Sequence, residues 1–129
     1  MKITVLLKAV AVVELLTGIG LLLAPSLVAN LLLGQPLASG VSLVVARVAG
    51  MALIAIGLVC WLESVTKRAG QPTALILGLL AYNGGVPLLL LHSYIFNDLS
   101  GIGLWPAVGL HLAFSAWIAA CIRSQSTAV

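Results

Sequence analysis

The sequence predicts an all-α integral membrane protein: a four-helix bundle with a short outer interfacial helix between helices 1 and 2. Of the 129 residues, 62% are hydrophobic and 7% are charged, which excludes an ordinary soluble domain. Four apolar segments of about 20 residues are each long enough to cross a bilayer once. These spans cover residues 3–23, 41–62, 73–96 and 104–122, and we expect residues 1–129 to form one transmembrane domain.

Charge and cysteine content exclude several kinds of site. The six basic residues are scattered along the chain, so we expect no nucleic-acid partner. Cys60 and Cys121 have no CxxC or metal-ligand spacing, so we predict neither a redox motif nor a metal site. The first apolar segment is full length and is followed by three others, which indicates a retained span rather than a cleaved signal peptide.

The first span carries Glu14 in its middle, within AVVELLTGIG. At about 1.5 Å rise per residue the span reaches about 30 Å, the thickness of the hydrocarbon core, so Glu14 lies near the midplane. An ionisable side chain is costly there. We therefore expect it to face protein, to have a partner and to mark a functional site.

The connection after this span, APSLVANLLLGQPLASG, is long and apolar. Pro25 ends the first helix, residues 27–33 predict a short helix on the outer face, and Gly34 with Pro36 ends it. This helix is either an apolar linker resting on the bundle or a lid over a site beneath it.

The second span contains Arg47 and a small-residue face formed by Ala46, Gly50 and Gly57, which permits close helix packing. The direct connection between the first two spans favours their being neighbours, and Arg47 would then reach Glu14. Such an ion pair would either fix the helix register or belong to a ligand site.

The third and fourth spans supply an amide and two histidines. Pro87 deprives the Asn83 carbonyl of its helical donor, which predicts a kink and inward-facing polar groups. His92 follows further out, and the fourth span carries His111. A stripe of small residues on the fourth span predicts tight packing, for which another helix of the same chain is favoured over a dimer partner; the stripe comprises Gly109, Ala113, Ala116 and Ala120.

Counting residues from the helix ends places five polar side chains in the outer half of the membrane or near its midplane. We predict that they form a ligand-binding or buried polar cluster: Glu14, Arg47, Asn83, His92 and His111. Its ligand would be a lipid headgroup or a quinone-like ring, since histidine exchanges protons near neutral pH. Haem is not favoured, because the two histidines differ by about 5 Å in counted depth. We assign no catalytic residue and no metal ligand.

Basic residues predict the orientation of the spans. All but Arg47 lie before or at the start of the first span, in the second connection or in the C-terminal tail, whereas the first and third connections have none. Because Lys and Arg favour cytoplasmic loops, we expect both termini in the cytoplasm. Tyr94 and Trp105 would then lie at the outer interface.

Two families share features with this chain. AVVELLTGIG in the first of four helices superficially resembles the small multidrug resistance transporters, which couple a first-helix carboxylate to proton exchange. The predicted Glu14–Arg47 pair and the long first connection argue against that function. Over the whole chain, and best over helices 1 and 2, the PSLV-type helix ending, LLLG in the outer segment and RVAGMALIAIG in the second helix resemble the DoxX-like group of small bacterial four-helix membrane proteins.

The DoxX-like resemblance implies a multi-pass protein of the bacterial inner membrane. That group's namesake is a membrane component of a thiosulfate:quinone oxidoreductase, which implies a redox-associated or quinone-adjacent role. We therefore expect a non-catalytic subunit or small ligand-binding module attached to other membrane proteins. The alternative is a proton-coupled transporter acting as a homodimer.

Overall fold

The computed structural model describes residues 3–66 and 72–126 and confirms the predicted fold class. These residues form five helices and no strand: α1 (Ile3–Leu23), α2 (Pro25–Leu33), α3 (Gly40–Val65), α4 (Thr73–Asn97) and α5 (Leu104–Ser126). Four of them are long and apolar enough to cross a membrane, as expected of a multi-pass membrane protein. α4 remains a helix through Pro87.

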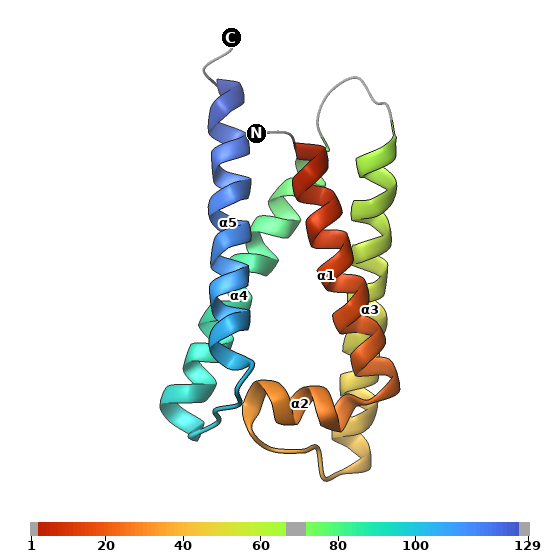
Figure 1. Ribbon diagram of the computed structural model, residues 1–129, viewed down its shortest axis with the longest axis vertical. Helices are drawn as coiled ribbons and strands as arrows, with labels where there is room; N and C mark the ends of the chain where they lie inside the picture. The colour runs from red at the N-terminus through yellow and green to blue at the C-terminus, as the bar shows by residue number, and fades with distance from the viewer. Residues whose placement is uncertain (1–2, 67–71, 127–129) are drawn as a thin grey trace.

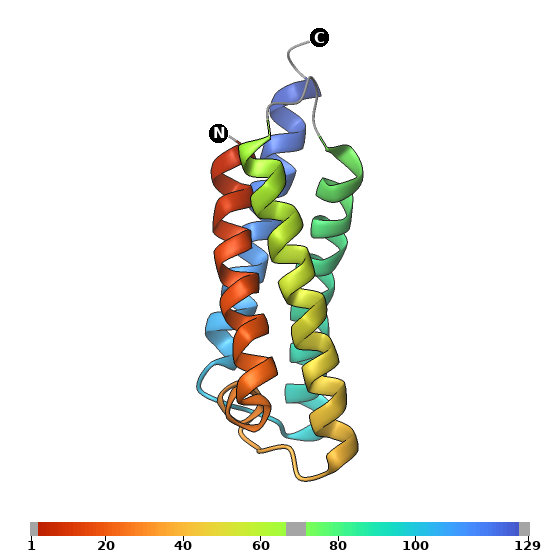
Figure 2. The ribbon, with the colours of Figure 1, turned by 90° about the vertical axis from the view of Figure 1, so that its right-hand side faces the viewer.

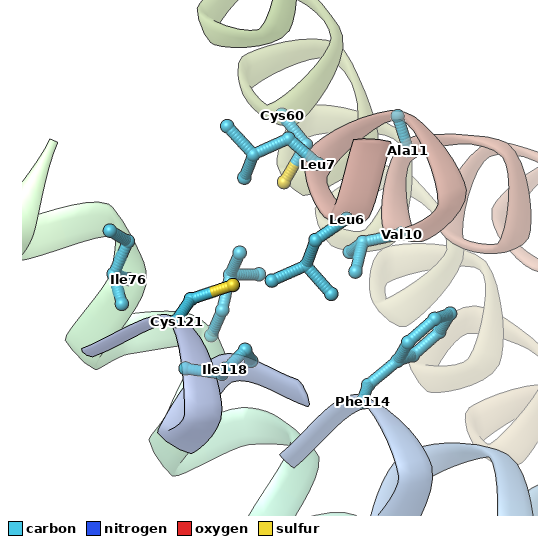
Figure 3. Packing of buried hydrophobic residues seen from close by; sticks show 10 residues of the cluster. Leu6, Leu7, Val10, Ala11, Cys60, Ile76, Phe114, Ile118 and Cys121 are labelled. Atoms are coloured by element: carbon cyan, nitrogen blue, oxygen red, sulfur yellow. The ribbon is translucent and has the colours of Figure 1, made fainter. Parts of the chain in front are cut away.

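The long helices form two antiparallel pairs, α1 with α3 and α4 with α5 (Figure 1). The pairs meet at the end where α1 begins and α5 ends, and α2 lies across the opposite end (Figures 1 and 2). A hydrophobic core fills the first of these ends. In Figure 3, Leu6 of α1 points toward Cys121 of α5, and Val10 lies beside Leu6.

The α1–α3 contact confirms the packing predicted from small residues. A Cβ atom added to Gly50 would lie 2.8 Å from the Gly18 carbonyl oxygen, and one added to Gly57 would lie 3.1 Å from the Ala11 carbonyl oxygen. Only glycine permits this approach, because ordinary van der Waals contact needs more room. The two backbones therefore touch at fixed points, and these points determine which residues of α1 and α3 lie at the same level.

The short outer helix is present as α2 and is bonded to the connection between α4 and α5. It ends at Gly34, whose φ of +76° is left-handed, a conformation that favours glycine. The Leu32 and Leu31 carbonyls accept hydrogen bonds from the amides of Gly101 (3.1 Å) and Gly103 (2.8 Å). α2 thus links the α1–α3 pair to the α4–α5 pair at this end of the bundle.

The small-residue stripe on α5 faces away from the described part of the chain, so the favoured expectation of packing against another helix of the same chain is wrong. Gly109, Ala113, Ala116 and Ala120 are all exposed, and a Cβ atom on Gly109 would meet nothing within 4 Å. α5 instead turns its opposite face inward, where larger side chains such as Phe114 and Ile118 are buried. Those side chains span the wider separation between α5 and its neighbours.

Candidate polar site in the bundle centre

Glu14 is buried in the middle of α1, as the sequence predicted. Only 1% of its surface is exposed, and it lies one helical turn beyond Val10 and Ala11 of the hydrophobic core. The carboxyl group therefore lies where the apolar core ends. Burial at this depth is costly unless other polar groups compensate for the lost hydration.

The hydrogen-bond donor that Glu14 finds is Tyr82 of α4. The Tyr82 hydroxyl donates to Glu14 Oε2 at 3.2 Å. Glu14 Oε1 is also buried, but it accepts no hydrogen bond from the described part of the chain. One oxygen of the carboxyl group is thus available to a further donor.

A second hydrogen-bonded pair joins α4 to α5. Asn83 Oδ1 lies 2.8 Å from His111 Nδ1, and Asn83 Nδ2 donates to the Leu79 carbonyl at 2.9 Å. Asn83 is fully buried and His111 is 9% exposed. The Asn83 amide therefore bonds to the imidazole through its oxygen and to the backbone of its own helix through its nitrogen.

These bonds determine how the His111 ring is protonated. Because Asn83 Nδ2 is the donor to Leu79, Oδ1 must be the acceptor, and His111 Nδ1 carries the hydrogen. In the neutral ring Nε2 is then an acceptor. The ring also packs edge-on against Tyr82, with centroids 5.5 Å apart. Tyr82 thus contacts both Glu14 and His111, and we call these residues with Asn83 the central polar cluster.

The predicted ion pair between Glu14 and Arg47 is not formed. Arg47 is exposed, and neither oxygen of Glu14 bonds to it. The α1–α3 register explains this result. Since Gly18 faces Gly50, antiparallel packing brings Arg47 level with Leu21, about 10 Å along α1 from Glu14.

His92 also lies outside the central polar cluster. It is exposed and packs against Phe96 on its own helix, with ring centroids 4.8 Å apart. Nine residues separate it from Asn83, or about 14 Å along α4. His111 is level with Asn83, so the two histidines do not face each other.

Counting residues from the helix ends did not predict which side chains meet, because the end of α4 and the start of α5 lie at different levels. His111 is seven residues into α5, whereas its partner Asn83 is fourteen residues from the end of α4. α4 therefore runs about 10 Å past the start of α5, as Figure 1 shows at its lower left. Tyr94 near the end of α4 packs edge-on against Trp105 of α5 at 5.4 Å.

Tyr82 is the member of the cluster that the sequence analysis missed. It directly precedes Asn83 in the polar interruption of the third span, and this neighbourhood was the available signal. An aromatic residue within a span is usually interpreted as a packing residue rather than as a hydrogen-bond donor. Its hydroxyl could be assigned only once the folded bundle had brought the Tyr82 side chain of α4 within hydrogen-bond distance of Glu14 on α1.

The described residues offer little for metal or thiol chemistry. Within 3–66 and 72–126, no three His, Cys, Asp or Glu side chains gather where they could hold a metal ion. Cys60 and Cys121 are both buried and form no disulfide. The chemistry of the central polar cluster is therefore that of one carboxyl, one phenol, one amide and one imidazole group, which can bind hydrogen-bonding groups and exchange protons.

Comparisons with protein-family models, with curated proteins and with solved structures find no match.

Proposed function

We propose that this chain is a non-catalytic integral membrane module that binds a small ligand at the central polar cluster and works within a larger membrane complex. The observation that carries the proposal is Glu14 Oε1, a buried carboxylate oxygen without a hydrogen-bond donor among the described residues. Leaving such an acceptor unsatisfied costs about 1–3 kcal/mol or more. A ligand that donates a hydrogen bond there would recover this energy.

The cluster favours a ligand with a polar head and an apolar body. Glu14 Oε1 and His111 Nε2 are acceptors, while the residues around them are those of membrane-spanning helices. A quinone-type ring in its hydroxyl form or a lipid headgroup combines these properties, and the resemblance to DoxX-like proteins supports the same class. We assign no catalytic step to the cluster.

The second candidate is a proton-coupled transporter that acts as a homodimer. One observation favours it: Arg47 does not pair with Glu14, and that pair was the main objection to this function. A carboxyl group in the middle of a span that forms no ion pair with a described basic residue is the element that such a transporter requires.

The two functions predict different purified states. In mild detergent, a subunit should bring other polypeptides with it, whereas the transporter should be isolated as a homodimer alone. We propose a bacterial inner membrane location with both termini in the cytoplasm, on the basis of the basic residues. A reporter that is active only in the cytoplasm, fused after Val129, tests this orientation.

The ligand-binding proposal is tested by mass spectrometry of lipophilic molecules that co-purify with the protein from its native membranes. Glu14→Gln should lower the ligand content at least about tenfold, which corresponds to about 1.4 kcal/mol. In this variant the glutamine oxygen can still accept the hydrogen bond from Tyr82. The NH₂ group then replaces Oε1, and because it is a donor it cannot bond to the donor of the ligand. Arg47→Gln, outside the cluster, is the matched control and should retain the ligand. Equal ligand content in both variants would refute the proposal.

A further inference from the structure

An apolar groove runs between α3 and α4 from the outside of the bundle to Tyr82. Its volume is about 410 Å³, within the usual range for ligand pockets. Among the described lining residues, Tyr82 supplies the only polar side-chain group. The lining residues are Ala55, Ile56, Val59, Ala74, Leu75, Gly78, Leu79 and Tyr82.

The groove is open toward the surface that would face lipid. Val59 and Gly78 are exposed, whereas Leu79 is buried and Tyr82 is half-buried. Both helices are candidate spans, so this opening would lie within the membrane. A molecule dissolved in the lipid could enter sideways without crossing either polar interface.

Tyr82 connects the groove with the central polar cluster. Its side chain lines the groove, and its hydroxyl donates its single hydrogen to Glu14 Oε2. The phenolic oxygen retains lone pairs that can accept a hydrogen bond. Glu14 itself does not line the groove. The polar side-chain atom that a ligand in the groove would meet is therefore an acceptor, Tyr82 Oη, and the ligand must supply the donor.

We propose that this groove admits a lipophilic alcohol or phenol from the lipid phase, with its hydroxyl group donating to Tyr82 Oη. The inference rests on the proposed function and adds to it the route and the ligand class. The apolar lining holds the hydrocarbon body, and the donor requirement distinguishes a hydroxyl compound from its ether or ester. No covalent step is involved.

The test uses a 4-alkylphenol with a photoreactive diazirine in its alkyl chain, added to the full-length protein in nanodiscs. Wild-type protein should be labelled saturably on peptides that contain Val59 or Gly78. Excess unlabelled phenol should prevent labelling, whereas its methyl ether, which has no hydroxyl hydrogen, should compete at least tenfold less well.

Three variants separate the groove from the rest of the surface. Gly78→Leu fills the groove, and Gly109→Leu is its matched control, because a Cβ atom at either glycine meets nothing within 4 Å. Labelling should weaken at least tenfold in Gly78→Leu and stay unchanged in Gly109→Leu. Tyr82→Phe keeps the shape of the ring and removes only its hydroxyl, so it should weaken labelling about fivefold to tenfold.

Two outcomes would overturn the inference. Equal labelling of Gly78→Leu and wild type would refute the route, and equal competition by the phenol and its ether would refute the ligand class. In either case the proposed function survives if the native ligand content still depends on Glu14. If that content does not depend on Glu14, the proposed function fails as well.

Discussion

Replacing Gly18 by leucine is expected to separate α1 from α3 and to lower the yield of folded protein severely. A Cβ atom at this position would lie 2.7 Å from the Gly50 carbonyl oxygen and 2.8 Å from Ile54 Cγ1. The first of these is a backbone atom, which cannot move aside as the end of a side chain can. The helices would have to move apart along the whole crossing.

The expected destabilisation is about 3 kcal/mol, at the upper end of the usual range for overpacking. Helix association in lipid depends on close van der Waals contact, so a wider crossing is not compensated by the hydrophobic effect. Unfolding in mixed micelles, followed by circular dichroism as SDS increases, measures the change. Gly109→Leu makes the same chemical change at an open position and should have little effect. Equal stability of the two variants would show that the crossing is not close.

The second large effect is expected from Asn83→Leu. Leucine is of similar size but cannot accept the hydrogen bond of His111 Nδ1 or donate to the Leu79 carbonyl. The His111 N–H would remain in a buried site without an acceptor, which costs about 1–3 kcal/mol. We expect a loss of about 2 kcal/mol in the same SDS titration.

A matched control and a double variant make this prediction specific. Asn97→Leu changes the exposed last residue of the same helix and should shift stability by no more than about 0.5 kcal/mol. Adding His111→Leu to Asn83→Leu removes both partners and should recover part of the loss. If the two single losses add without recovery, the amide and the imidazole do not form the bond described.

Helix positions and the closest contact followed from the sequence because both depend on local patterns. Apolar length identified the four spans, and small residues at Gly50 and Gly57 predicted a face for close helix packing, which meets α1. Pro25 and Gly34 similarly bounded α2. Each of these features is determined by neighbours in the chain or by the thickness of a bilayer.

The composition of the candidate site was predicted only in part, because it depends on how far the helices are shifted along one another. Glu14, Asn83 and His111 are buried as expected, whereas Arg47 and His92 are exposed. The shift between α4 and α5 is produced by a connection that starts at Asp98, whose φ is 52°, and that bonds to α2. Counting residues from the ends of the predicted helices cannot give this shift.

The outward stripe on α5 illustrates the same difficulty. Small residues indicate that a face can approach another helix closely, but they do not identify the helix. In α3 the small face meets Gly18 of α1, whereas in α5 the stripe containing Gly109 has no neighbour among the described residues. The spacing of small residues is similar in α3 and α5, and only the folded bundle shows which of the two faces packs against another helix.

The central claim is that Tyr82, and not Arg47, is the partner of Glu14, and a pair of double-mutant cycles tests it most directly. Stability in mixed micelles is measured for Glu14→Leu with Tyr82→Phe, and for Glu14→Leu with Arg47→Gln. We predict a coupling energy of about 1 kcal/mol or more for Glu14 with Tyr82, as for a hydrogen bond to a carboxyl group. Glu14 and Arg47 should be additive within about 0.5 kcal/mol, since they lie about 10 Å apart along the helix. Coupling to Arg47 together with additivity for Tyr82 would contradict the account.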